Sequence, residues 1–218
     1  RIRELLALGA HRVGVKDPTG LLTPERAKTL FPAVMQAAGG TLVELHSHCQ
    51  SSLAPEVYSE AIKAGFHTVH TAVMPLANGA SLPAVEDIAR RAAELGVETS
   101  LDMDAIAEIS GYFDWLCVRE GKPRGRVVEF DPALYSHQVP GGMISNLKSQ
   151  LETMQMGHRL PEILEEVGRV REDLGYPILV SPFAQFVVTQ AVINVIQGER
   201  YKTIPDEVRK YAMGYYGR

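Results

Sequence analysis

The sequence lacks several features that would place the protein in a membrane, in a secretory pathway or on nucleic acid. No apolar run in the 218-residue chain is long enough to span a bilayer, which takes about 20 residues as a helix. The N-terminal stretch RIRELLALGAHRVGV is not a secretory signal, because charges interrupt it and no small-residue cleavage site follows. The 22 basic and 26 acidic residues are mixed along the chain, with no basic block or acidic tail. We therefore expect no membrane insertion and no nucleic-acid partner.

Cysteine is also scarce. Cys49 and Cys117 are too few for a disulfide framework, so a reducing cytoplasm is the expected location. Cys49 is expected to be a small buried side chain and not a nucleophile, because no motif places a base beside it. The chain does not begin with Met, so we expect it to be cut from a longer polypeptide. Its 45% of hydrophobic residues is enough to build a sizeable core.

Short strands and amphipathic helices alternate over roughly the first 100 residues. Thr23 and Pro24 have the residue types that begin a helix, as N-cap and first helical residue. The alternation predicts right-handed βαβ units with a parallel sheet, and therefore an α/β fold. Strands are expected at 11–15, 41–46 and 68–73, and helices at 1–8, 24–38, 55–64 and 83–95.

The rest of the chain is mainly helical by pattern. The segment GKPRGRVVEFDP is expected to be a loop with a short strand, and QVPGGM a turn in which Gly141 and Gly142 are free to take positive φ. We place a boundary near residues 97–103, which divides the chain into domains 1–100 and 101–218. Further helices are expected at 102–120, 161–174, 184–196 and 205–213.

Two histidines follow the strand that contains LVEL. His46 and His48 are two residues apart, so on a strand both side chains lie on the same face. Lys16 and Asp17 stand at the end of the preceding strand, and parallel α/β folds place their chemistry at the carboxyl ends of the strands. Imidazole is a good ligand for zinc and similar metals. The pattern therefore predicts a metal site at this edge, with further ligands supplied from elsewhere.

Longer motifs resemble those of the biotin-dependent carboxyltransferases, in the right order and along essentially the whole chain. The first half carries VKDPTGLLTPERA, LHSHCQSSLAPEVYSEAIKAG and TAVMPLANGASLP. The second half carries QVPGGMISNLKSQL, LVSPFAQFVVTQAVINVIQGERYKTIPDEV and GYYGR. The family includes the carboxyltransferase domain of pyruvate carboxylase, the alpha subunit of oxaloacetate decarboxylase and the carboxyltransferase subunit of transcarboxylase. The second-half motifs are most similar to the last two.

The resemblance implies a (β/α)8 TIM barrel with a mainly helical extension over its mouth. Residues 1–100 then correspond to about strands six to eight of the barrel, and residues 101–218 to the extension. Three strands cannot close a barrel. Either the chain is part of a longer polypeptide, or another chain completes the sheet.

The resemblance also implies a divalent metal, usually zinc and sometimes cobalt or manganese. Lys16 matches a lysine ligand that carries a carboxylate on its nitrogen, and His46 and His48 match the family's H-x-H pair. The carbamate makes chemical sense, because a protonated ammonium cannot bind a cation. The family's aspartate ligand lies on the first strand of the barrel and has no counterpart in this chain.

Ser181 in LVSPFAQ matches a family threonine that shuttles a proton between biotin and the enolate of the substrate. The resemblance thus implies carboxyl transfer or decarboxylation between carboxybiotin and a 2-oxo acid such as pyruvate or oxaloacetate. The chain has no M-K-M biotinylation motif, so the biotin is expected on a separate carrier domain. The expected partners are that carrier domain, a biotin carboxylase component and a second copy of the protein in a homodimer.

Several positions depart from the family pattern. His70 begins HTA where the family has D-T-A, and residues 80–83 are ASLP in place of T-S-Q-P. Phe183 and Ala184 replace a small polar pair, and Ser52 replaces a glycine. These substitutions lie near the expected pocket and leave the predicted metal ligands intact.

Simpler interpretations stay open. The histidine pair could be polar residues at the end of an ordinary strand, Lys16 a surface lysine and Ser181 a helix N-cap. His70 is expected to pack or hydrogen-bond inside the barrel. Two other functions are a catalytically weak scaffold subunit of a carboxylase complex, and an aldol- or Claisen-type lyase, which would lack the PGGM…NLxSQL extension. The remaining histidines are expected on the surface: His11, His67, His137 and His158.

Overall fold

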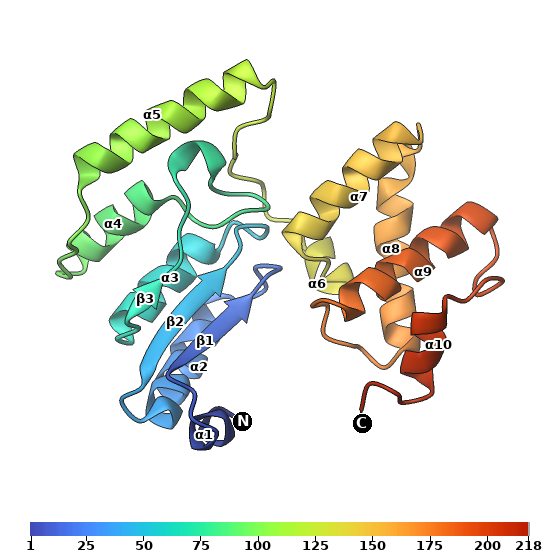
Figure 1. Ribbon diagram of the computed structural model, residues 1–218, viewed down its shortest axis with the longest axis horizontal. Helices are drawn as coiled ribbons and strands as arrows, with labels where there is room; N and C mark the ends of the chain where they lie inside the picture. The colour runs from blue at the N-terminus through green and yellow to red at the C-terminus, as the bar shows by residue number, and fades with distance from the viewer. Residues whose placement is uncertain (218) are drawn as a thin grey trace. The chain divides into compact units, whose positions relative to one another are not determined.

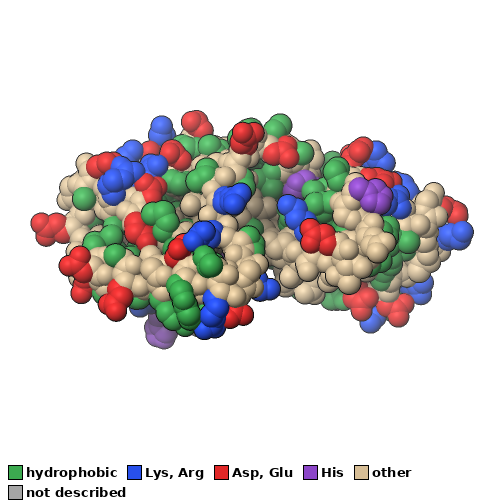
Figure 2. All heavy atoms as spheres, turned by 90° about the horizontal axis from the view of Figure 1, so that it is seen from above, with side chains coloured by type: hydrophobic (Ala, Val, Ile, Leu, Met, Phe, Trp, Pro, Cys, Tyr) green, Lys and Arg blue, Asp and Glu red, His purple; other side chains and the backbone are tan. Residues whose placement is uncertain are grey.

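The computed structural model describes residues 1–217, and their internal contacts define two compact units that divide between Phe130 and Asp131. No helix in this part of the chain is long and apolar enough to cross a membrane. On the face drawn in Figure 2, Lys and Arg side chains are interspersed with Asp and Glu. This distribution agrees with the mixed charge pattern of the sequence.

The first unit contains a parallel sheet with strand order β1-β2-β3, as the alternation of strands and helices predicted (Figure 1). The α/β fold class is therefore confirmed. Its elements are α1 (Ile2–Ala7), β1 (Arg12–Asp17), α2 (Pro24–Ala38), β2 (Leu42–Ser47), α3 (Ala54–Lys63), β3 (Thr68–Val69), the 3₁₀ helix η1 (Met74–Leu76), α4 (Val85–Glu94) and α5 (Met103–Arg119).

Local sequence signals set the ends of α2. The Thr23 side chain accepts a hydrogen bond from the backbone N–H of Arg26 at 3.2 Å, and Pro24 is the first helical residue. Gly39 ends the helix at φ 58°, a left-handed conformation that glycine adopts without steric cost. The predicted N-cap and the predicted stop are both confirmed.

The two faces of the sheet differ in what covers them. Val43 and Leu45 on β2 are fully buried and pack against α2 and α3, with Phe31 and Tyr58 in the same core. Fully burying an apolar side chain of this size contributes about 1.5–3 kcal/mol. The alternate residues of β2, among them His46, are only partly covered. The helices therefore bury one face and leave the histidine face free for chemistry.

Two expected strands differ from the structure. β3 contains only Thr68 and Val69, although a strand was expected over 68–73. No strand forms among the described residues 121–132, where a short one was expected. This segment instead lies against the loop around η1, where Gly125 donates its N–H to the Pro75 carbonyl at 2.8 Å. A side chain at Gly125 would collide with the backbone of Ala77, so the segment is held by a close approach of two loops and not by strand pairing.

The division between the compact units lies about one helix beyond the boundary expected near residues 97–103. α5 contacts η1 and is therefore part of the first unit. The assignment of residues 1–100 to a partial barrel and of residues 101–218 to an extension stays a prediction.

The second unit is helical. α9 crosses α8 and packs against it (Figure 1), and their core includes Ile163, Val167 and Val187, which are fully buried. Its elements are α6 (Ala133–His137), α7 (Gly141–Thr153), the 3₁₀ helix η2 (Gly157–Arg159), α8 (Leu160–Asp173), α9 (Phe183–Gln197) and α10 (Asp206–Ala212).

The expectation that the two glycines of QVPGGM take positive φ in a turn is wrong. Gly141 begins α7, and neither Gly141 nor Gly142 has a positive φ. Pro140 is the N-cap residue at φ −60° and ψ 146°, so the chain enters the helix directly after an extended residue. Glycine is disfavoured in a helix interior because of its backbone entropy, but Gly141 and Gly142 lie in the first turn of α7.

A polar network is buried between the helices of the second unit. Glu166 on α8 is 4% exposed and accepts hydrogen bonds from Asn194 Nδ2 and from Arg200 Nε, both at 2.7 Å. Asn194 Oδ1 in turn accepts from Gln190 Nε2 and from the backbone N–H of Tyr201. The network joins α8, α9 and the segment that follows α9, and it pairs the buried carboxylate with a cation.

His137 is buried, so its expected place on the surface is wrong. It is 6% exposed, and its Nδ1 accepts a hydrogen bond from the backbone N–H of Val139 at 3.0 Å. Burial lowers the pKa of His137, and the nearby Asp131 opposes this shift only in part. The folded protein therefore favours the neutral ring more strongly than the unfolded chain does.

This burial predicts a dependence of stability on pH. Below about pH 6.5 the unfolded chain binds a proton at His137 that the folded protein takes up only at lower pH. The free energy of unfolding therefore decreases as the pH is lowered, by at most about 1.4 kcal/mol per pH unit. His137→Asn, which keeps an acceptor for Val139, should flatten this slope in urea unfolding followed by circular dichroism. His158→Asn at an exposed site is the matched control and should keep it. Equal slopes in all three proteins would contradict the role of His137.

Candidate metal centre

Strand register brings the predicted ligands to one face of the sheet. Lys16 on β1 is the direct neighbour of His46 on β2 in the parallel pairing. On the other side of β2, the backbone N–H of His70 donates to the carbonyl of Leu45 at 2.9 Å, which continues the pairing of β3. His46 therefore lies between Lys16 and His70, and the predicted juxtaposition of Lys16 with the histidine pair is present at the level of the backbone.

The imidazoles of His46 and His48 point toward each other. Their Nε2 atoms are 3.1 Å apart. Two nitrogen ligands of a tetrahedral zinc ion, each at about 2.0–2.1 Å, lie roughly 3.3 Å apart. Within residues 1–217 no group of three or more His, Cys, Asp or Glu side chains is arranged to hold a metal ion. The pair fits two positions of a metal site, and Lys16 is the candidate for a third.

The outer nitrogen of His48 is held by a loop. Its Nδ1 donates to the carbonyl oxygen of Ala80 at 2.7 Å, which leaves the lone pair on Nε2. The same loop is joined to the strand end by a hydrogen bond from Cys49 N–H to the Ser81 carbonyl at 2.8 Å. Because the backbone of Ala80 makes the contact, the loss of the family's threonine side chain at this position does not disturb it.

Asp17 organises the end of β1. Its carboxylate is 8% exposed and accepts hydrogen bonds from the backbone N–H groups of Leu21 and Leu22 and from the hydroxyl of Ser47. Its carbonyl accepts from the backbone N–H of His48 at 3.0 Å. All of these bonds serve to position loops and the histidine strand.

Tyr58 supports the site from the covered face of the sheet. Its hydroxyl accepts a hydrogen bond from Ser47 N–H at 3.1 Å and lies 2.7 Å from the His70 carbonyl, to which it donates. Burial raises the pKa of Tyr58, so the phenol stays protonated and keeps this donor. Pattern analysis did not identify Tyr58, because a tyrosine on the apolar face of a helix has the ordinary appearance of a core residue.

His70 and Glu44 also lie at the site; motif analysis placed His70 near the expected pocket without a ligand role and did not single out Glu44. His70 Nδ1 lies 3.1 Å from Nδ1 of His46, and His70 Nε2 lies 3.5 Å from a carboxylate oxygen of Glu44. A hydrogen bond from Arg12 lowers the pKa of Glu44. The signal in the sequence was the alternation itself, because Glu44 shares the face of His46 two residues away.

The electrostatic surroundings keep His46 neutral. Burial, with smaller contributions from the neighbouring His48 and Lys16, lowers the pKa of His46 to about 4. A neutral imidazole is the form that binds a metal. His46 therefore requires no deprotonation near pH 7 before it can act as a ligand.

Ser181 belongs to the second unit and lies two residues before α9, where it is exposed. The N-cap residue of α9 is Pro182, and the cap has no side-chain hydrogen bond. The interpretation of Ser181 as a helix cap is therefore wrong. Phe183 packs edge-on against Phe186 and Tyr211, with ring centroids 5.6 Å apart in each case, so its ring forms part of an aromatic cluster.

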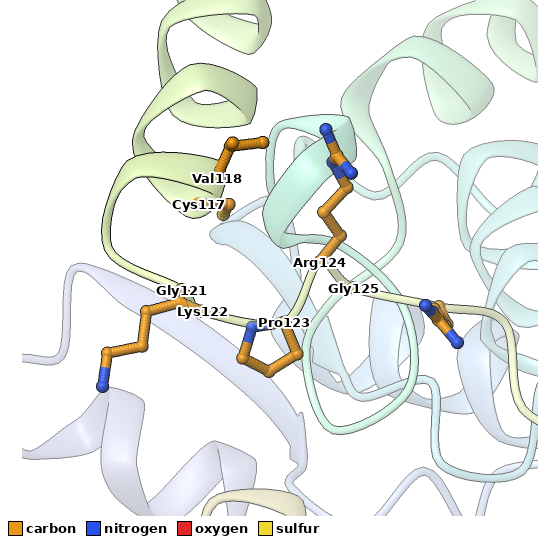
Figure 3. Close-up of a pocket in the computed structure, with 8 residues that line it drawn as sticks. Cys117, Val118, Gly121, Lys122, Pro123, Arg124 and Gly125 are labelled. Carbon is orange, nitrogen blue, oxygen red and sulfur yellow. The ribbon is translucent and has the colours of Figure 1, made fainter.

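A further pocket in the first unit contains none of the predicted site residues. It lies between the end of α5 and the segment that follows it (Figure 3). Arg124 at this pocket is paired with Asp114 on α5. The lining residues are Cys117, Val118, Gly121, Lys122, Pro123, Arg124, Gly125 and Arg126.

The sheet with its histidine pair and the helical unit each match a known family. Residues 2–112 match the family described as HMGL-like, and residues 134–218 match the one described as conserved carboxylase domain. The chain belongs to the HMGL-like family, and its second part matches the conserved carboxylase domain. The resemblance to biotin-dependent carboxyltransferases is confirmed. A lyase without the extension is disfavoured, because the extension is present.

Some relatives align with almost the whole chain. A pyruvate carboxylase subunit of Methanothermobacter thermautotrophicus is 40% identical over 99% of this chain. The 2-oxoglutarate carboxylase large subunit of Hydrogenobacter thermophilus is 36% identical over 99% of it. The chain spans 38% and 33% of the lengths of these two proteins.

Solved structures of the carboxyl transferase domain of Rhizobium etli pyruvate carboxylase share the fold. One of them, a variant with pyruvate, has a TM-score of 0.89 at 27% identity and covers 100% of this chain and 37% of the other. Another, with pyruvate and biocytin, has a TM-score of 0.87 at 27% identity and covers 96% of this chain and 36% of the other. The α/β unit and the helical unit thus each have a counterpart in a carboxyl transferase domain.

Proposed function

We propose that the intact protein containing this chain transfers a carboxyl group between biotin and a 2-oxo acid. The observation that carries the proposal is the 40% identity, over 99% of this chain, with a pyruvate carboxylase subunit. A relative named for 2-oxoglutarate is 36% identical, so the substrate class is a 2-oxo acid, with pyruvate or oxaloacetate as the leading members. A catalytically weak scaffold within a carboxylase complex is the alternative that an activity assay must exclude.

The three parallel strands are proposed to form part of a (β/α)8 barrel, as about its sixth to eighth strands. Support comes from the strand order β1-β2-β3, in which each strand pairs with the next in sequence. The chain aligns with only 37% of a carboxyl transferase domain, and the remaining strands would come from outside it. A closed barrel needs more strands than these three.

Lys16, His46 and His48 are proposed to hold a divalent metal, zinc in the first place and cobalt or manganese as alternatives. The separation of the two Nε2 atoms, 3.1 Å, supports this choice. Lys16 would act after its amine has taken up carbon dioxide as a carbamate, because its ammonium form has no lone pair to offer. The bound metal would polarise the carbonyl group of the 2-oxo acid. His46 and His48 would hold it at the carboxyl end of β2.

Ser181 is proposed to move a proton at the ureido nitrogen of biotin, as a positioned hydroxyl. Its exposure and the absence of a capping bond leave the hydroxyl available. The biotin would reside on a separate carrier domain, with a biotin carboxylase component as the second partner and a homodimer as the assembly. Two buried free cysteines fit a protein of the reducing cytoplasm.

Biotin-dependent decarboxylation of oxaloacetate tests the proposal. Transfer of the carboxyl group from oxaloacetate to biotin leaves pyruvate, so purified intact protein should form pyruvate faster when biotin is added. Lactate dehydrogenase and NADH report the pyruvate continuously. Samples without protein measure the spontaneous decarboxylation. Pyruvate formation that biotin leaves unchanged would contradict carboxyl transfer and favour the scaffold.

A further inference from the structure

Four side chains form a continuous line of contacts on the open face of the sheet. Arg12 on β1 donates a hydrogen bond to Glu44 on β2. The other carboxylate oxygen of Glu44 lies 3.5 Å from Nε2 of His70. Nδ1 of His70 lies 3.1 Å from Nδ1 of His46. The line therefore runs from a charged pair at one end to a candidate metal ligand at the other.

These contacts determine which ring nitrogens of His70 and His46 carry a proton. A carboxylate accepts hydrogen bonds and donates none, so it favours a proton on the His70 nitrogen that faces it, which is Nε2. A neutral imidazole protonated at Nε2 carries its lone pair on Nδ1. Nδ1 of His70 then accepts the proton of His46 Nδ1 at 3.1 Å. The lone pair of His46 is left on Nε2, which points toward His48.

The opposite arrangement of protons would prevent His46 from binding a metal through Nε2. With its proton on Nδ1, His70 would donate to His46, and the proton of His46 would move to Nε2. That proton would point at Nε2 of His48, whose lone pair is fixed because its Nδ1 donates to Ala80. The two histidines would then bond to each other instead of to a metal. In addition, an unprotonated nitrogen of His70 would face the carboxylate of Glu44.

We propose that Glu44 and His70 are positioning residues that hold His46 in its metal-binding tautomer and thereby set the affinity of the site. The inference rests on the proposed metal site. Metal-bound histidines commonly donate their other ring N–H to a carboxylate, directly or through another group, and loss of such a partner weakens binding about 10–100-fold. Here the carboxylate acts through one additional imidazole ring, at the position where the resembling family has an aspartate.

Cobalt binding to the intact protein tests the proposal. The affinity for Co²⁺ is measured in bicarbonate buffer by competition with a chelator, and the visible absorption of bound Co²⁺ reports its coordination. His70→Phe and Glu44→Gln should each weaken binding about 10–100-fold and change the spectrum. His70→Asp, which offers His46 Nδ1 a carboxylate oxygen, should recover most of the affinity. His11→Phe, at an exposed histidine before β1, is the matched control and should bind as the unmodified protein does.

The outcomes distinguish the positioning role of Glu44 and His70 from the proposed metal site itself. Equal affinity in His70→Phe, Glu44→Gln and the unmodified protein would overturn the positioning role and leave the metal site standing. An unmodified protein that binds no Co²⁺ would overturn the metal site and the positioning role with it. Melting temperatures of the metal-free variants identify any loss that arises from misfolding. Glu44→Gln, which keeps the size of the side chain, decides the test when His70→Phe fails to fold.

Discussion

Replacement of both His46 and His48 by alanine is expected to remove the metal from the intact protein. The two Nε2 atoms are 3.1 Å apart and supply both nitrogen ligands of the proposed site. Metal analysis should show about one equivalent in the unmodified protein and almost none in the double variant. Because a bound metal lowers the barrier by several kcal/mol, biotin-dependent pyruvate formation should fall by roughly 10³-fold.

The matched control replaces two exposed histidines, His11 and His158, by alanine. It changes the same number of imidazoles but touches neither strand end of the site. Its metal content and turnover should equal those of the unmodified protein. The same metal content in both double variants would rule out His46 and His48 as the ligands.

Ser181→Ala is expected to lower carboxyl transfer by roughly 10²-fold, the scale of a positioned acid–base group. Metal content should stay the same, because Ser181 is not among the proposed ligands. Ser181→Thr should retain or raise activity, because it restores the residue of the resembling family. The melting temperature of Ser181→Ala should also be unchanged, since Pro182 is the N-cap of α9 and the cap has no side-chain hydrogen bond.

Ser149→Ala on the exposed surface of α7 is the control for this substitution. Turnover and melting are measured on all three variants. Full activity in Ser181→Ala would remove Ser181 from the proposed catalytic groups. It would also suggest that the departures from the family pattern at Ala80, Leu82 and Phe183 accompany a pocket that does not accept biotin.

Short-range patterns were sufficient for most of the first unit. The strands that end near Lys16 and His48 were predicted from alternation, and the start of α2 from Thr23 and Pro24. Each of these signals acts within a few residues, since side chains on a strand alternate between faces and a cap bonds to its own helix. The H-x-H spacing predicted a shared face for the same reason.

Patterns failed where backbone partners were distant or absent. β3 is shorter than the expected strand over 68–73, and within residues 1–217 the segment 121–132 has no neighbouring strand to pair with. A strand exists only where another strand satisfies its backbone N–H and carbonyl groups. The helix that begins at Gly141 was missed because two consecutive glycines indicate a turn locally, whereas Leu147 and Leu151 of the same helix are buried in the core of the second unit.

The local order of residues was enough to establish that His46 and His48 share a face and that Lys16 ends the preceding strand. The neighbours of His46 depend on strand register, which pairs it with Lys16 on one side and places His70, 24 residues away, on the other. Register is a property of the whole sheet, because a shift of one residue would turn every side chain to the opposite face. For that reason the contacts that Glu44, His70 and Tyr58 make at the candidate site became apparent only once the strands and α3 were assembled.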